Sequence, residues 1–124
     1  IRSGAKTMRG INKVILVGML GANPIPKQFQ NGGSYAQFSI ATSEKYQDKR
    51  TGDWIENTEW HRIVAHNRLG EIACQFLKKG SKVYIEGSLH TRKWTDQNNQ
   101  ERYVTEVRAI TFQSLDSLPQ ANPV

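Results

Sequence analysis

The spacing of apolar residues changes once along this chain, from the two-residue period of a strand to the 3.6-residue period of a helix, and then changes back. Residues 54–66 and residues 82–94 alternate between apolar and polar positions. Between them, apolar residues fall at i, i+3, i+4, i+7 and i+8, namely Leu69, Ile72, Ala73, Phe76 and Leu77. The pattern predicts a single amphipathic helix placed between strands.

The expected helix carries end signals in the sequence. Asn67 is a possible N-cap, and Gly80 stands where a C-terminal glycine belongs. Lys78 and Lys79 are expected in the last turn, where cations favour the negative end of the helix dipole.

Two strands are expected before residue 54. Residues 12–20 form a nearly continuous apolar run around Gly18, which predicts a buried strand that bends or bulges at the glycine. Prolines at positions 24 and 26 are then expected to stop regular pairing. The turn signal NGG at residues 31–33 predicts a hairpin into a half-buried strand with three alternating apolar residues, Ala36, Phe38 and Ile40.

Alternation also assigns the two faces of each later strand. One face of the third strand holds Thr58, Trp60, Arg62, Val64 and His66, and the other holds Glu59, His61, Ile63 and Ala65. In the fourth strand the residues expected inside are Val83, Ile85, Gly87 and Leu89, and those expected outside are Tyr84, Glu86, Ser88, His90, Arg92 and Trp94. A polar tip at residues 96–100 and a strand at residues 102–112 complete a hairpin.

The order of elements predicts the fold class. Five strands with one helix between the third and fourth strands are typical of the all-β oligonucleotide/oligosaccharide-binding (OB) fold, a five-stranded Greek-key barrel. Other α+β arrangements remain open from the pattern alone. A doubly wound nucleotide-binding domain is not expected, because βαβ alternation and the motifs GxxxxGK[ST] and GxGxxG are absent from the sequence.

The charge of the chain points to a polyanionic partner. Seventeen Lys and Arg residues oppose eleven Asp and Glu residues, which gives a net charge of +6. No apolar run approaches the roughly 20 residues of a membrane-spanning helix. The only cysteine, Cys74, cannot form an intrachain disulfide, so a reducing compartment and a small core residue are expected.

Aromatic and basic residues share the same strand faces. Trp60 lies near Arg62, and Trp94 lies near Arg92. An isolated tryptophan is more often a core residue, but these two alternate out of phase with aliphatic rows, so we expect them to face outward. Rings beside cations suit nucleic acid, because bases stack on rings and phosphates attract cations. Further residues of these kinds fall in or beside the preceding hairpin: Tyr46, Trp54, Lys45, Lys49 and Arg50.

The three histidines invite a metal-site or catalytic interpretation, which we do not favour. His61 and His66 lie on opposite faces of one expected strand, and His90 lies on another. No HExxH or Cys/His spacing accompanies them. We therefore expect no metal, no cofactor and no enzymatic activity, and a nuclease is the least favoured alternative.

Five ordered blocks of sequence resemble the bacterial single-stranded DNA-binding protein (SSB) family. They are residues 9–18 (RGINKVILVG), 31–33 (NGG), 58–62 (TEWHR), 79–87 (KGSKVYIEG) and 91–97 (TRKWTDQ). The resemblance implies an OB fold, usually a homotetramer, that coats single-stranded DNA during replication, recombination and repair without sequence preference. An interaction module of a primosome-like assembly, with weak DNA binding, is the alternative.

The resemblance also implies roles for individual residues. Trp60 and Trp94 match two base-stacking tryptophans, Tyr46 replaces a third, and His66 stands where the family often has a stacking phenylalanine. With Trp54, these form the expected stacking set. The expected phosphate contacts are Arg9, Lys13, Lys49, Arg62, Arg92, Lys93 and Arg102. His61 is expected near a subunit contact.

The ends of the chain are expected to differ from its middle. Residues 1–7 resemble a tag or leader remnant, residues 8–113 are the expected DNA-binding domain, and residues 114–124 are an expected flexible tail. Family members typically continue to an acidic tip that recruits replication and repair proteins, so such partners are expected only if an acidic tail follows this chain. The expected location is the bacterial cytoplasm, on the nucleoid, in preference to a mitochondrion, and no membrane partner is expected.

Overall fold

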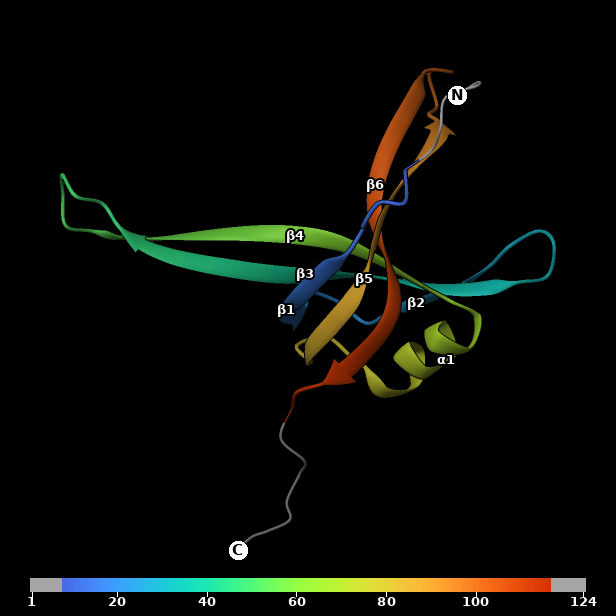
Figure 1. Cartoon of the computed structure of the whole chain (residues 1–124), viewed down its shortest axis with the longest axis horizontal. Coiled ribbons are helices and arrows are strands. Elements are labelled where there is room, and N and C mark those ends of the chain that lie inside the picture. Colours follow the sequence, from blue (N-terminus) through green and yellow to red (C-terminus); the bar gives the residue numbers. More distant parts are fainter. Residues whose placement is uncertain (1–7, 117–124) are drawn as a thin grey trace, which may run out of the picture.

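The computed structural model describes residues 8–116, which fold into strands and one helix (Figure 1). The elements in chain order are β1 (Val14–Leu20), β2 (Ile25–Gln28), β3 (Ser34–Gln47), β4 (Trp54–His66), α1 (Asn67–Phe76), β5 (Lys82–Thr95) and β6 (Glu101–Ser114). No helix in this described part is long and apolar enough to cross a membrane.

Five of the strands close into a barrel. The strands neighbour one another in the order β1-β5-β6-β4-β3, and β1 also pairs with β3, which completes the ring. Every pairing is antiparallel except that of β4 with β6, which is parallel. This arrangement, with α1 between β4 and β5, confirms the predicted OB-type barrel.

The barrel interior is filled by the aliphatic rows that alternation predicts. Ile40, Ile63, Val83 and Ile85 have the largest fully buried side chains. Phe38, Ala65, Val107 and Ala109 belong to the same cluster, and Ala73 and Leu77 join it from the helical segment. Burial of such side chains is the main force that holds a small barrel together.

The expectation that the prolines at positions 24 and 26 end the pairing is wrong. Ile25 to Gln28 form the short strand β2, which pairs with Ser34 to Gln37 of β3. Pro26 is tolerated because β2 pairs with β3 alone, so the side without a partner needs no N–H group. The predicted turn joins the two strands, with Gly32 at a φ of 101° and the Phe29 N–H donating to the Gly33 carbonyl at 2.7 Å.

The predicted bulge at Gly18 is wrong: the glycine instead allows the backbones of β1 and β3 to approach each other closely. The register of β1 against β5 runs without a shift through Gly18. A Cβ atom at Gly18 would collide with the carbonyl oxygen of Ala41, where β1 crosses β3. The irregularity lies instead between Glu86 and Gly87, where the register of β5 against β6 shifts.

The predicted helix forms, but its ends differ from the prediction. Asn67 adopts a φ of 52°, and its side-chain oxygen accepts a hydrogen bond from the Ser34 N–H at 3.3 Å, so it ties α1 to β3 instead of capping the helix. The helix ends at Phe76, before Lys78 and Lys79, so neither lysine lies in its last turn. Gly80 has a φ of 88° and lies in the following turn.

The run at residues 12–20 is not buried as a whole as expected, because Ile15, Val17 and Met19 are about half exposed. Two further apolar residues that the pattern placed inside also lie at the surface. Phe76 is 66% exposed at the end of α1, and Leu89 is 49% exposed in β5. Neither marks the edge of the core, because Leu77, which follows Phe76, and Val107, which lies opposite Leu89, are both buried.

Two long hairpins project from the barrel in different directions (Figure 1). The β3–β4 hairpin turns at residues 48–53, where the Gly52 N–H donates to the Asp48 carbonyl at 2.7 Å. The β5–β6 hairpin turns at residues 96–100, where the Asp96 carboxylate accepts hydrogen bonds from the Asn98 and Gln100 N–H groups at 2.9 and 3.0 Å. A backbone bond at the first tip and side-chain bonds at the second therefore hold the two turns.

The chain beyond β6 begins by pairing with the start of β5. The Leu115 N–H donates to the Lys82 carbonyl at 2.8 Å, and the Asp116 carboxylate accepts from the Lys82 N–H at 3.0 Å. The rest of the expected tail, 117–124, and the expected remnant, 1–7, lie outside the described residues.

Candidate nucleic-acid interface

The candidate site is the outer face of four neighbouring strands, β3, β4, β6 and β5. Strand register sets its residues side by side. Across β3 and β4, Ser39 lies opposite Arg62 and Tyr35 lies opposite His66. Val64 of β4 lies opposite Arg108 of β6. Across β5 and β6, the opposed pairs are His90 with Glu106, Arg92 with Val104 and Trp94 with Arg102.

Three adjoining depressions run across this face, and together we call them the groove. The first is lined by Trp60 and shares Lys27 and Gln37 with the central one. The central one, of about 560 Å³, shares Arg92 with the third, which contains Trp94. A tryptophan therefore lies at each end, and four cations and one carboxylate line the groove: Lys27, Arg62, Arg92, Arg108 and Glu106.

Trp60 is presented by β4 and supported by a glycine. Its side chain is 60% exposed, as its alternation out of phase with Ile63 predicts. A Cβ atom at Gly21 would lie 2.5 Å from Cζ3 of the indole, so the ring edge packs directly on the Gly21 backbone. The ring is thus held in place while much of its surface stays open for a base.

Trp94 occupies the other end of the groove, on the β5–β6 hairpin. It is 44% exposed and lines a depression with Arg62 of β4 and Arg92 of β5. Two guanidinium groups beside an open indole suit a nucleotide, which offers both a ring and a phosphate.

Two of the three remaining candidate stacking residues lie on the β3–β4 hairpin, outside the groove. Trp54 and Tyr46 are both exposed. Trp54 is an even number of residues from Trp60 and shares its face of β4. Tyr46 pairs with Ile55 and therefore lies on the opposite face. The structure does not bring Tyr46 together with the tryptophans.

His66 lies in an aromatic cluster that sequence reasoning missed in part. Its ring meets Phe29 edge-on at 5.5 Å between centroids, and Phe29 packs on Tyr35 at 4.5 Å. Burial lowers the pKa of His66, and the charges of Arg108 and His90 lower it further. Phe29 was missed because it precedes the NGG turn, where no strand was expected. Tyr35 could have been found, because it alternates with Ala36 and Phe38 of the expected strand.

Four of the seven candidate phosphate contacts already form a salt bridge with a carboxylate group. Arg92 binds Glu106 through two hydrogen bonds, of 3.1 and 3.2 Å, and Glu106 is buried. The other three pairs are Lys13–Glu86 at 2.9 Å, Lys93–Glu101 at 3.2 Å and Arg102–Asp96 at 2.8 Å.

Carboxylate pKa values reflect two of these pairs. The hydrogen bond between Lys13 and Glu86 raises the pKa of the lysine and lowers that of the carboxyl group. The hydrogen bond from Arg102 lowers the pKa of Asp96, assisted by the N–H groups of Gln100 and Asn98. These cations are therefore partly neutralised.

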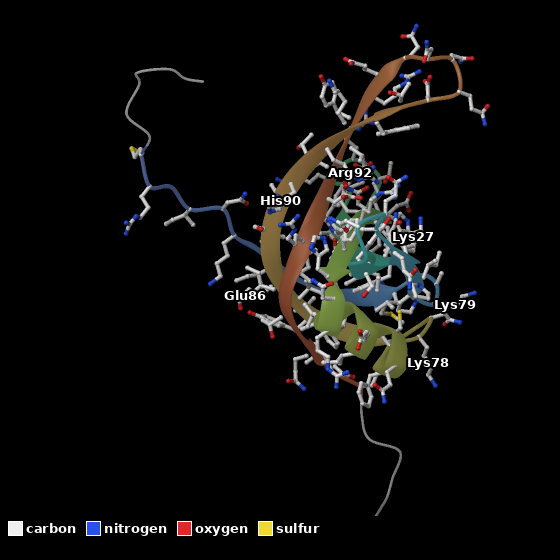
Figure 2. All side chains as sticks on the ribbon, turned by 90° about the vertical axis from the view of Figure 1, so that its right-hand side faces the viewer. Lys27, Lys78, Lys79, Glu86, His90 and Arg92 are labelled. Carbon is white, nitrogen blue, oxygen red and sulfur yellow. The ribbon has the colours of Figure 1, made fainter. Side chains whose placement is uncertain are left out.

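The remaining three candidate cations, Arg9, Lys49 and Arg62, form no salt bridge within residues 8–116. Only Arg62 lines the groove, because Arg9 precedes β1 and Lys49 lies at the β3–β4 tip. Lys27 and Arg108 also line it and were missed. Arg108 could have been found, because it alternates with buried Val107 and Ala109. Figure 2 shows Lys27, His90 and Arg92 over the upper barrel, with Lys78 and Lys79 lower, by α1.

His61 lies outside the groove, on the opposite face of β4. Its Nε2 atom is 2.8 Å from the Thr42 hydroxyl. On the other face, β1 carries a row of half-exposed apolar side chains, Ile15, Val17 and Met19; Met19 pairs with Ala41 of β3, which pairs with Trp60. Cys74, expected in the core, is only partly buried, and this burial raises the pKa of its thiol. Within the described residues, no group of three His, Cys, Asp or Glu side chains could hold a metal ion.

A protein-family model and solved structures are similar to this chain. The model of the single-strand binding protein family matches residues 11–115. The chain is similar to an SSB of Plasmodium falciparum, solved in complex with single-stranded DNA, at 35% identity and a TM-score of 0.79, covering 90% of this chain and 100% of that one.

A second similar structure is a deletion mutant of the single-stranded DNA-binding protein from Thermus aquaticus. The identity is 28% and the TM-score is 0.73, covering 87% of this chain and 52% of that one. With a family model that spans almost all of the described residues and a barrel of the same type, the chain belongs to the single-strand binding protein family.

Proposed function

We propose that this protein coats single-stranded DNA by laying the strand along the groove, in replication, recombination and repair. Bases stack on Trp60 and Trp94, and Lys27, Arg62 and Arg108 bind the phosphates. Support comes from the position of two exposed tryptophans at the ends of one groove lined by cations. The Plasmodium falciparum relative was solved with single-stranded DNA, which supports the same ligand.

This chemistry explains binding without sequence preference. Every base has a π-face, so stacking on tryptophan does not distinguish one base from another. Phosphate contacts are likewise the same for every nucleotide, and they release counterions as they form. Binding is therefore expected to be tight at low salt, to weaken as salt rises, and to depend little on sequence.

Quenching of tryptophan fluorescence tests the proposed function. Titration with oligo(dT) at low salt is expected to quench Trp60 and Trp94, because a stacked base contacts each indole directly. Quenching should reverse as salt is added. Unchanged fluorescence together with unchanged anisotropy of a labelled oligo(dT) would contradict single-strand binding.

We propose that residues outside the groove make secondary contacts with the DNA strand. Trp54 shares the face of Trp60 and can extend the stacking path, while Tyr46 requires the strand to pass around the β3–β4 hairpin. Lys49 at its tip and Arg9 before β1 are exposed cations that can reach phosphates at the margins. Lys13, Arg92, Lys93 and Arg102 contribute less, since each already holds a carboxylate.

We also propose that the protein assembles as a homotetramer. The half-exposed row Ile15, Val17 and Met19 on β1 gives an apolar surface for a second copy. His61 is proposed at a further contact between subunits. Light scattering of the protein alone is expected to give the mass of four chains, and Val17→Glu should lower it. A monomer mass for the unmodified protein would contradict this assembly.

The family assignment supports a binding protein without catalytic activity. We propose residues 8–113 as the DNA-binding domain, and a place of action on the nucleoid in the bacterial cytoplasm. Recruitment of replication and repair proteins is proposed only where an acidic tail follows this chain.

A further inference from the structure

The central part of the groove gathers side chains from every strand that surrounds His66. The aromatic contacts come from Phe29 and Tyr35. The charged or titratable groups that line the same cavity are Lys27 on β2, Tyr35 on β3, His90 and Arg92 on β5, and Glu106 and Arg108 on β6. Two histidines therefore share one cavity of about 560 Å³.

The charge balance of this cavity favours an anionic ligand. Its only carboxylate, Glu106, is bound by Arg92 through two hydrogen bonds. Lys27 and Arg108 form no salt bridge within the part of the chain that the structure describes. Since two cations are left over, a phosphate in the cavity would find positive charge on both sides.

The protonation of His66 is expected to depend on whether an anion is bound in this cavity. Burial lowers the pKa of His66, and Arg108 and His90 lower it further against the opposing effect of Glu106, which favours the neutral ring in the free protein. His90 Nε2 lies 3.0 Å from the Ser88 hydroxyl. A neutral imidazole beside a cation gains a proton most readily when a negative charge arrives.

We propose that the central cavity is a phosphate subsite for single-stranded DNA in which His66, with His90 in the same cavity, takes up a proton as the backbone enters. This inference rests on the proposed function and adds a regulation to it. The bound phosphate offsets the charges of Lys27 and Arg108, so the protonated imidazole of His66 becomes favourable and donates a hydrogen bond to a phosphate oxygen. Binding is then linked to proton uptake.

The direction of the effect follows from this linkage. A group whose pKa is higher in the complex than in the free protein strengthens binding as pH falls through the window between the two values. Above that window both forms carry a neutral ring, and affinity no longer depends on pH. Because the pKa of His66 in the free protein lies below its usual value, we expect the affinity for oligo(dT) to rise severalfold from about pH 8 to about pH 6, toward a limit of about tenfold for one unit of pKa difference.

Calorimetric and fluorescence titrations with oligo(dT) test the proposal on the whole chain. Thymine has no group that titrates in this range, and ordinary carboxyl groups titrate below it. Affinity is measured at several pH values at constant salt. Titration at about pH 6.5 in two buffers with different ionisation heats counts the protons taken up. The unmodified protein is expected to take up about half a proton per occupied cavity at this pH, the uptake that corresponds to a pKa difference of about one unit.

Two variants test whether the histidines of the cavity account for the proton uptake. The double variant His66→Phe, His90→Gln keeps an aromatic ring and a polar side chain, and its affinity is expected to stay constant with pH, with no proton uptake. His61→Gln removes the only other histidine, on the opposite face of β4, and is expected to keep the full dependence on pH. Light scattering on each variant checks that the assembly is the same.

The outcomes separate this inference from the proposed function. Binding that is equally tight at both pH values, or a rise in affinity that persists in the double variant, would overturn the proton-linked subsite and leave the proposed function standing. Loss of the rise in His61→Gln alone would also overturn it. Absence of binding at any pH and low salt would overturn the proposed function, and the subsite with it.

Discussion

Trp60 and Trp94 are held in different ways, so they respond to different substitutions. The edge of the Trp60 ring packs on the backbone of Gly21. Trp94 instead lines a depression with Arg62 and Arg92. The first ring depends on the absence of a side chain at its neighbour, and the second depends on the charges around it.

Gly21→Ala is expected to weaken DNA binding through Trp60. The new methyl group would lie 2.5 Å from the indole, so the ring must move. Affinity for oligo(dT), measured by anisotropy, should fall by up to the roughly 1–3 kcal/mol that is typical of one stacked base in single-strand binding OB folds. Gly10→Ala is the matched control, because nothing lies within 4 Å of its new Cβ atom.

A double-variant comparison separates positioning from a general loss of stability. In a Trp60→Ala background, Gly21→Ala should cost no further affinity. Additive losses in the two variants would show that Gly21 does not act through Trp60.

Arg62 and Arg92 are expected to differ in what their removal changes. Arg62→Ala should reduce the slope of log affinity against log salt by about one, because an unpaired cation in the groove is lost. Arg92→Ala removes the partner of buried Glu106 and should lower the free energy of unfolding by about 1–3 kcal/mol.

Salt titrations with oligo(dT) and urea unfolding of both variants make this comparison. A salt slope unchanged in Arg62→Ala would show that Arg62 does not contact phosphate. Unchanged stability in Arg92→Ala would show that the Arg92–Glu106 pair contributes little to the fold.

At the scale of elements, closure of the barrel depends on the crossing of β1 over β3. A Cβ atom at Gly18 would strike the Ala41 carbonyl oxygen and approach Ile40. Gly18→Ala is therefore expected to lower the free energy of unfolding by about 1–3 kcal/mol, as overpacking does. Urea unfolding measures it, with Gly10→Ala again as the control, and equal stability of the two variants would contradict a tight crossing.

Strand faces were predictable because alternation is a local property of the chain. The inward rows around Ile63 and Ile85 and the outward positions of Trp60 and Trp94 follow from it directly. Contacts between distant segments were not predictable in the same way. Pairing of β2 with β3, the Asn67 bond to Ser34, and the carboxylate partners of Arg92 and Arg102 all depend on the folded barrel.

At the scale of the molecule, the net charge of +6 overstates the charge available to DNA. Four candidate phosphate contacts are paired with carboxylates, whereas Lys27, Arg62 and Arg108 line the groove without a salt bridge within residues 8–116. The distribution of charge, and not its sum, therefore marks the path of the strand. The salt dependence of binding should reflect this smaller set.

The most direct measurement is the affinity of Trp60→Ala, Trp94→Ala for labelled oligonucleotides, by anisotropy at low salt. Phe76→Ala is the matched control, since Phe76 is an exposed aromatic residue outside the groove. The double variant should lose about 2–6 kcal/mol of binding free energy, twice the value typical of one stacked base in single-strand binding OB folds, for every base composition. Affinity equal to that of Phe76→Ala, or a loss confined to one base, would contradict binding by stacking in the groove.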